Sequence, residues 1–208
     1  MSRENRWEDH YARRARKERW LARSVYKLEE IDRKYRLLRP GLRILDLGCY
    51  PGSWSQYSLK KVGPGGEVVG IDLRAPERLS ASNFRFIRAD VLALDAERMA
   101  REVGERDVLL SDLAPSTTGI AVADASRSLE LAERALALGL AVLGTGGGFL
   151  CKVFEGEDLS GFRKRMKEHF KRTRTIRPSA VRKGSREVYI LGQDLIMKKQ
   201  FITLIADC

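Results

Sequence analysis

Cysteine, histidine and long apolar runs are all scarce in this sequence. Its 208 residues include three cysteines and two histidines, and Cys49, Cys151 and Cys208 lie far apart. Neither a disulfide framework nor a metal-ligand spacing is visible, so we expect no metal and a reducing, cytoplasmic location. No run of about 18 apolar residues occurs, which predicts no membrane-spanning helix. The first 20 residues also have no apolar segment typical of a secretory signal.

Positive charge is what the sequence has in excess. The chain carries 39 Lys and Arg against 28 Asp and Glu, a formal net charge of +11. Residues 1–43 hold 14 basic and 7 acidic side chains, residues 163–186 hold 11 and 1, and the remainder is net acidic. Two basic blocks beside an acidic centre indicate a polyanionic partner and suit a surface that follows RNA phosphates. Two solvated helix faces are the competing interpretation.

Short apolar segments alternate with amphipathic ones along the chain. The pattern predicts strands at 43–47, 67–72, 83–87, 107–111, 149–154, 172–176 and 187–191. It predicts helices at 25–37, 53–61, 95–103, 122–143 and 158–170. Ser24 and Ser53 are candidate N-caps, and Gly144–Gly148 is expected to end the long helix. Such alternation is typical of a doubly wound α/β fold with a mainly parallel sheet.

Acidic residues lie at the end of the first two predicted strands and after the third, where open α/β sheets bind their ligands. The first turn carries Asp46, Gly48 and Gly52 and does not match G-x-G-x-x-G. An acid there repels a pyrophosphate but suits a cationic amino-acid group. Asp72 suits two ribose hydroxyls, and Asp90 can accept from an adenine amino group. The set indicates S-adenosylmethionine rather than NAD as cofactor; helix caps and turn residues are the competing interpretation.

Seven segments together resemble the FtsJ/RrmJ-type ribosomal RNA large subunit methyltransferases, in the order that family has them. They are SVYKLEEID (24–32), LDLGCYPGSWSQY (45–57), VVGIDL (68–73), ADVL (89–92), LLSDLAPSTTG (109–119), GGGFLCKVFEGE (146–157) and SREVYILG (185–192). The resemblance implies a seven-stranded, Rossmann-like methyltransferase sheet and methyl transfer from S-adenosylmethionine to a ribose 2′-hydroxyl. It also divides the chain into a basic arm (1–23), a methyltransferase domain (24–192) and a tail (193–208).

The resemblance implies a catalytic tetrad on Lys27, Asp112, Lys152 and Glu187. It implies cofactor contacts on Gly52, Trp54, Asp72, Asp90 and Asp112. Lys152 lies inside an apolar segment, where an unpaired lysine is costly, so a functional role is favoured. We expect Lys152 to be the general base, its pKa lowered by burial and by Lys27, with Asp112 orienting it.

The expected substrate is a uridine of large-subunit ribosomal RNA, within a large ribosomal subunit particle. The enzyme is expected to be a monomer. Transfer RNA, an mRNA cap and a non-catalytic RNA-binding role are the alternatives. Basic residues of both blocks are expected to contact phosphates. They are Arg13, Arg14, Arg16, Arg19, Arg23, Arg163, Lys164, Arg172, Arg174, Arg182 and Lys183.

Overall fold

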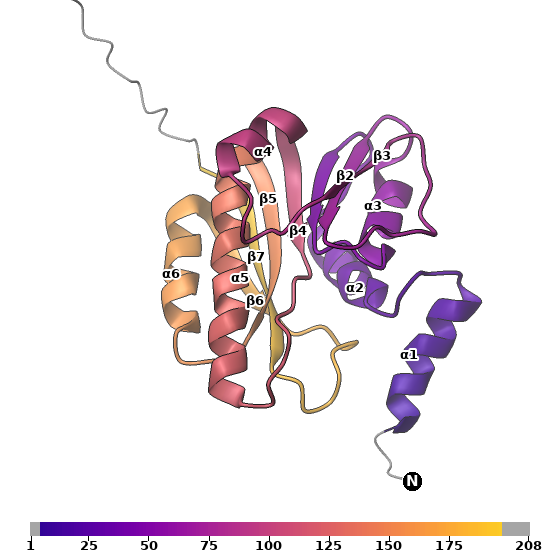
Figure 1. Cartoon of the computed structure of the whole chain (residues 1–208), viewed down its shortest axis with the longest axis vertical. Coiled ribbons are helices and arrows are strands. Elements are labelled where there is room, and N and C mark those ends of the chain that lie inside the picture. Colours follow the sequence, from indigo (N-terminus) through magenta and orange to yellow (C-terminus); the bar gives the residue numbers. More distant parts are fainter. Residues whose placement is uncertain (1–4, 197–208) are drawn as a thin grey trace, which may run out of the picture.

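The computed structural model describes residues 5–196, which form six helices and seven strands (Figure 1). The helices are α1 (Asn5–Lys17), α2 (Val25–Tyr35), α3 (Ser53–Val62), α4 (Ala96–Val103), α5 (Ala121–Val142) and α6 (Leu159–His169). The strands are β1 (Arg43–Leu47), β2 (Glu67–Asp72), β3 (Phe84–Arg88), β4 (Arg106–Ser111), β5 (Leu143–Phe154), β6 (Phe170–Ile176) and β7 (Glu187–Leu195). Every strand and helix predicted from the sequence is present within a few residues of its expected bounds, except that β5 begins earlier.

All seven strands belong to one sheet, in the order β3-β2-β1-β4-β5-β7-β6. The strands β1 to β5 pair in parallel, whereas β7 runs antiparallel to both β5 and β6. The chain winds outward from β1 to β3 and then from β4 in the other direction. The order therefore reverses between β1 and β4, and ligands of such sheets bind outside the carboxyl ends of these strands. The predicted doubly wound, mostly parallel fold is confirmed.

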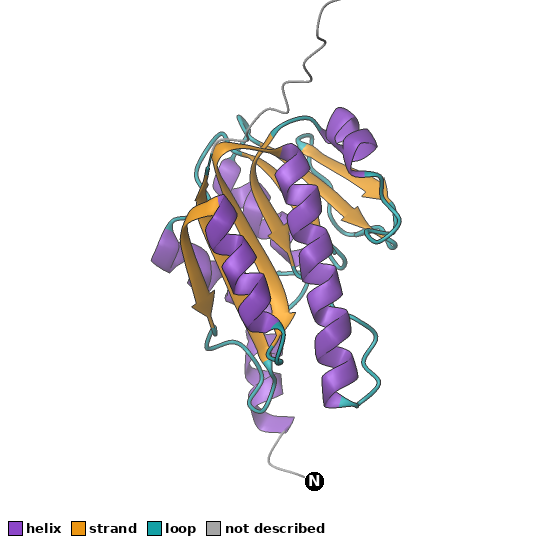
Figure 2. Ribbon diagram, turned by 90° about the vertical axis from the view of Figure 1, so that its left-hand side faces the viewer, coloured by secondary structure: helices purple, strands orange, loops and turns teal. Residues whose placement is uncertain are grey.

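Helices cover both faces of the sheet, which explains why its central strands are apolar on both sides. On one face, α2 and α3 pack against residues such as Ile44 and Val68. On the other, α4, α5 and α6 cover residues such as Leu45 and Val69. Figure 2 shows α5 and α6 side by side across this second face. Side chains of consecutive strand residues thus pack into the hydrophobic cores on opposite faces of the sheet, as expected for a strand buried on both faces.

The N-terminal basic segment packs on the α2–α3 face. Ala15 on α1 is 3% exposed, and the ring centroids of Trp20 and Tyr57 are 6.0 Å apart.

The division of the chain into arm, domain and tail stays a prediction, but two of its bounds can be compared with the helices and strands. Helix α1 lies within the predicted arm, and β7 extends past residue 192 to Leu195. The rest of the predicted tail, 197–208, lies outside the described residues.

Of the two predicted N-caps, Ser24 does hold the N-cap position of α2, whereas the N-cap position of α3 is Gly52 rather than Ser53. Neither Ser24 nor Ser53 caps a helix with its side chain, because their hydroxyls hydrogen-bond to each other at 2.9 Å. This bond instead joins the starts of α2 and α3. Gly144–Gly148 was expected to end the long helix, and α5 does end just before this segment, at Val142. The glycines themselves lie in the first part of β5. Leu143 pairs with Arg106 and Gly148 with Val108 of β4, and the register shifts between these two pairs, so the strand is irregular where the glycines lie.

Candidate active site

Lys152 and Asp112 meet at the carboxyl ends of β5 and β4. Lys152 is 7% exposed, and its Nζ lies 3.0 Å from Asp112 Oδ1. The same Nζ donates to the backbone oxygen of Asp112 at 2.6 Å. Two contacts to one residue fix the ammonium position and offset the cost of burying it. The lysine that the sequence places inside an apolar strand is therefore paired.

Lys27 and Glu187 form a second, partly buried ion pair beside the first. Lys27 on α2 places its Nζ 2.6 Å from Oε1 of Glu187, the first residue of β7. Their side chains are 14% and 11% exposed. Arg186, the chain neighbour of Glu187, donates to the backbone oxygen of Ala121. Helix α2 thus reaches over the sheet to complete the cluster.

Tyr189 joins the two ion pairs, and the sequence analysis missed it. Its phenol oxygen lies 2.6 Å from Glu187 Oε1 and 2.9 Å from Asp112 Oδ1. Burial raises the pKa of this phenol well above its usual value, and the two carboxylates raise it further. The phenol therefore stays protonated and donates to either carboxylate. Tyr189 pairs with Lys152 in the β5–β7 register, which brings both side chains to the face under α2.

Asp46 lies beneath the turn that follows β1. It is fully buried, and Ser55 donates to its Oδ2 at 2.6 Å. Burial raises the pKa of Asp46 to about 7, against the opposing effect of the Ser55 bond; nearby Asp112 and Asp72 also raise it. Among residues 5–196, its Oδ1 has no hydrogen-bond partner. A buried, half-satisfied carboxylate is stabilised by a nearby cation.

Asp72 and Asp90 lie near the ends of β2 and β3. Asp72 accepts from the backbone amide of Tyr50 at 2.9 Å, which ties the turn after β1 to β2. Asp90 is exposed and accepts from the backbone amide of Leu92 at 2.9 Å. Asp72 also accepts from the backbone amide of Arg74 at 3.0 Å, within the turn that follows β2. Leu92, close to Asp90, is 46% exposed.

The two glycines of the first turn have positive φ angles, +75° at Gly48 and +112° at Gly52. A Cβ on Gly48 would lie 2.8 Å from Leu113, which follows β4. A Cβ on Gly52 would lie 2.9 Å from Leu21. Glycine is therefore required both for the backbone conformation and for close packing of the turn.

Trp54 is buried, and its indole serves internal packing. Its Nε1 donates to the backbone oxygen of Ser24 at 2.9 Å, and its ring centroid lies 5.8 Å from that of Tyr189. The indole thus connects the predicted cofactor turn to the start of α2, which carries Lys27. Any contact of Trp54 with a cofactor stays a prediction.

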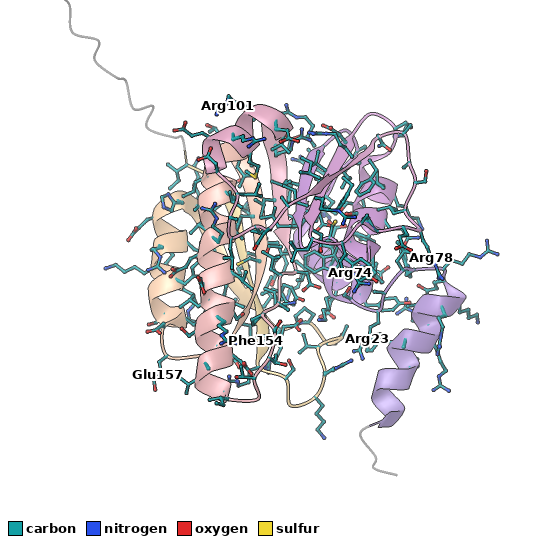
Figure 3. All side chains as sticks on the ribbon, viewed as in Figure 1. Arg23, Arg74, Arg78, Arg101, Phe154 and Glu157 are labelled. Atoms are coloured by element: carbon teal, nitrogen blue, oxygen red, sulfur yellow. The ribbon has the colours of Figure 1, made fainter. Side chains whose placement is uncertain are left out.

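The predicted RNA contacts fall on more than one surface. Arg13, Arg14, Arg16 and Arg19 are exposed on and after α1. Arg23 donates to the backbone oxygen of Ala180 at 2.9 Å, joining this region to the loop before β7 (Figure 3). Arg182 and Lys183 are exposed on that loop. The remaining four, Arg163, Lys164, Arg172 and Arg174, belong to α6 and β6.

Metal ligands and membrane segments are not found in the described part of the chain. Within residues 5–196, no three His, Cys, Asp or Glu side chains gather as metal ligands. No helix of that span has the length and apolarity to cross a membrane. Cys49 and Cys151 are buried and unbridged, and burial raises the pKa of both thiols.

The donor set fits a cationic nucleoside cofactor at the β1–β4 switch point. Acids lie at or near the carboxyl ends of β1 to β4, and the unpartnered oxygen of Asp46 suits a nearby positive charge. The lysine–carboxylate cluster of β4, β5, β7 and α2 lies directly beside them. This fold and site define an S-adenosylmethionine-dependent methyltransferase.

The chain belongs to the FtsJ-like methyltransferase family, whose sequence model matches residues 20–195. The family resemblance noted from the motifs is therefore confirmed. The chain is 44% identical over 188 residues to Ribosomal RNA large subunit methyltransferase E of Desulfatibacillum aliphaticivorans, covering 90% of this chain and 91% of that protein. It is 41% identical over 199 residues to the protein of the same name from Methanothermobacter thermautotrophicus, covering 95% and 94%.

Solved structures agree with this assignment. A Plasmodium falciparum protein described as a ribosomal RNA methyltransferase matches with a TM-score of 0.74 and 26% identity, covering 86% of this chain and 100% of that one. Aeropyrum pernix fibrillarin, solved with bound S-adenosyl-L-methionine, matches with a TM-score of 0.60. At 19% identity over 81% of this chain and 76% of that one, this second likeness shows the fold alone.

Proposed function

We propose that this methyltransferase methylates the ribose 2′-hydroxyl of a uridine in large-subunit ribosomal RNA. The observation that carries the proposal is the paired lysine at the carboxyl end of β5: Lys152 is buried yet held by two oxygens of Asp112. A ribose hydroxyl is a weak acid, so its methylation needs a base and exact placement. The names of the relatives support ribosomal RNA as the substrate.

The cofactor would lie along the carboxyl ends of β1 to β4. S-adenosylmethionine supplies an electrophilic methyl group on a positively charged sulfur. Asp72 and Asp90 would bind its ribose and adenine, while Gly48 and Gly52 allow the turn that borders it. Asp46, buried below, would stabilise the positive charge from beneath the turn. Asp112 would face the methyl group and Lys152 at once.

Lys152 would take the proton of the 2′-hydroxyl. A neutral lysine has two N–H bonds and one lone pair. Two oxygens of Asp112 lie within hydrogen-bond distance of Nζ, so both N–H bonds have acceptors. The lone pair is then left for the hydroxyl proton while the ribose oxygen attacks the methyl carbon. Positioning of base and acceptor is worth up to about 7–11 kcal/mol in favourable cases.

Lys27, Glu187 and Tyr189 would act as positioning residues. The contacts run in sequence from Lys27 to Glu187, Tyr189, Asp112 and Lys152. A connected polar cluster of this kind holds each member in one geometry. Lys27, at 14% side-chain exposure, is accessible enough to orient the ribose of the substrate.

The RNA would contact the exposed arginines of α1 and the basic residues after β5. Such contacts fix orientation without reading the base sequence. The RNA would be presented on a ribosomal particle, which fits the lack of a separate RNA-binding module among the described residues. The protein would act there as a monomer, in the cytoplasm.

The test is methyl transfer from radiolabelled S-adenosylmethionine to large ribosomal subunits from a deletion strain, followed by mapping of 2′-O-methylation. The proposal expects one ribose to be labelled by the wild type and none by Lys152→Ala, with unchanged cofactor binding by calorimetry. Lys60→Ala on α3 is the matched lysine control. Label in transfer RNA or a cap instead, or no cofactor binding, would contradict the proposal.

A further inference from the structure

The fold divides the second basic block between two faces of the sheet. Arg174 on β6 lies over the ring of Tyr35 of α2, with its guanidinium carbon 5.3 Å from the ring centroid. Its neighbours Thr173 and Thr175 point to the opposite face, because side chains alternate along a strand. That opposite face is covered by α6. Residues 163–186 therefore do not form one continuous surface.

A pocket lies between α6 and the edge strand β6, with a volume of about 460 Å³. Ser160, Arg163, Lys164 and Lys167 line it from the helix. Their spacing of three and four residues places them on one side of α6. Thr173 and Thr175 line it from the strand, and Arg174 and Ile190 complete the wall. No acidic residue contributes to this lining, and three hydroxyl groups do.

The cations of this pocket are not neutralised by any residue that the structure describes. Among residues 5–196, Arg163, Lys164 and Lys167 form no ion pair. Arg165 on the same helix provides the internal comparison, since it pairs with Glu133 of α5. Glu133 thus neutralises the arginine that faces α5, whereas the three cations beside β6 have no ion-pair partner in the described part of the chain. Three close like charges repel one another, so a bound anion would stabilise this arrangement.

The pocket lies close to the active site across the sheet. Thr175 pairs with Ile190, and Ile190 pairs with Cys151, the neighbour of Lys152. The pocket wall is therefore level with the catalytic strand residues and two strands away. Adjacent strands are about 4.8 Å apart, so the lateral separation is about 10 Å. A strand of RNA that passes over the edge of the sheet can reach both places.

We propose that the α6–β6 pocket binds phosphodiester groups of the substrate RNA, on the opposite face of the sheet from α2. The inference rests on the proposed function and deepens it, because it requires the RNA to follow the edge strand β6 around the sheet. Arg163, Lys164 and Lys167 supply the charge, and the hydroxyls of Ser160, Thr173 and Thr175 supply hydrogen bonds to phosphate oxygens. Such a site sets affinity and orientation and does not read sequence.

The pair Lys164→Gln with Lys167→Gln tests the pocket. Binding to large ribosomal subunits is measured by filter retention over a range of salt concentrations. Each phosphate contact adds about 0.7–1 to the slope of log K against log salt. The double variant should therefore lower the slope by about 2, and each single variant by about 1. Its KM for the subunits should rise while kcat at saturation stays within about twofold.

The matched control is Arg88→Gln with Arg98→Gln, which removes two exposed positive charges at the other edge of the sheet. The control should leave slope and KM unchanged. Equal losses in both pairs would mean that net charge alone acts, and an unchanged slope in the pocket pair would also overturn the inference. Failure of the proposed function is distinct: it would abolish methyl transfer in the wild type, whereas the salt slope reports the pocket without catalysis.

Discussion

Lys152 contacts Asp112 at two oxygens, 3.0 Å from the carboxylate Oδ1 and 2.6 Å from the backbone oxygen. The backbone contact does not depend on the charge of Asp112, so the lysine is held even if the carboxylate engages another group. Both acceptors come from the residue directly after β4, which also borders the predicted cofactor site. One residue thus links the position of the base to the position of the methyl donor.

Lys152→Arg separates a proton-accepting role from a purely electrostatic one. Arginine keeps the positive charge but does not lose its proton at accessible pH. If Lys152 is the general base, the variant should lose about 10²–10⁴-fold in kcat, as general-base removal does. Methyl transfer to ribosomal subunits is measured at saturating cofactor, with cofactor affinity checked by calorimetry. Recovery of more than about a tenth of wild-type kcat by arginine would contradict the base assignment.

Tyr189→Phe removes the hydroxyl that joins the two ion pairs and leaves the ring in place. Hydrogen bonds to charged groups contribute about 1.5–3 kcal/mol, so we expect kcat to fall by about 10- to 100-fold. Because Tyr189 acts through other residues, the variant should leave cofactor affinity unchanged and alter the pH profile of kcat. Tyr57→Phe is the matched control, since its hydroxyl donates to Asp32 at 2.8 Å outside the cluster. A Tyr189 variant that lost only thermal stability, as the control should, would show a merely structural role.

The case of Tyr189 shows where sequence reasoning ends. Lys152 was predictable, because a lysine inside an apolar strand needs a compensating partner. Tyr189 reads as one more apolar residue in the segment 187–191, and only the β5–β7 register places its hydroxyl between two carboxylates. Ser24 and Ser53 match the sequence pattern of N-caps, but tertiary contact joins them to each other. Strands and strand ends follow from local pattern, whereas cross-strand partners follow from topology.

Asp46→Asn should change how the cofactor-free protein responds to pH. The pKa of Asp46 is about 7 in the folded protein and 3.8 as its ordinary value, so between these values the folded state binds more protons. Stability from this group therefore falls as pH rises through that window and is lowest above pH 7. The variant lacks this loss, so its stability relative to wild type should rise from pH 5 to pH 8. About two pKa units of this window lie above pH 5, so the gain over this range is about 3 kcal/mol, at about 1.4 kcal/mol per pKa unit.

Thermal unfolding of both proteins across pH 5–8 measures this difference. Asp32→Asn is a poor comparison, because Asp32 is paired with Lys61 and Tyr57. Asp95→Asn on the surface N-cap of α4 is the better control and should give a difference that does not vary over this range. A constant offset between wild type and Asp46→Asn at every pH would rule out the raised pKa.

The basic surface of α1 and the α6–β6 pocket should contribute independently to RNA binding. Arg13→Gln with Arg16→Gln, three residues apart on α1, should lower the salt slope by about 2. If one RNA contacts both surfaces at once, combining this pair with Lys164→Gln and Lys167→Gln should lower the slope by about 4. Contributions from distant sites without shared partners normally add. If the two surfaces instead bind alternative RNA segments, the combined loss would fall well short of that sum.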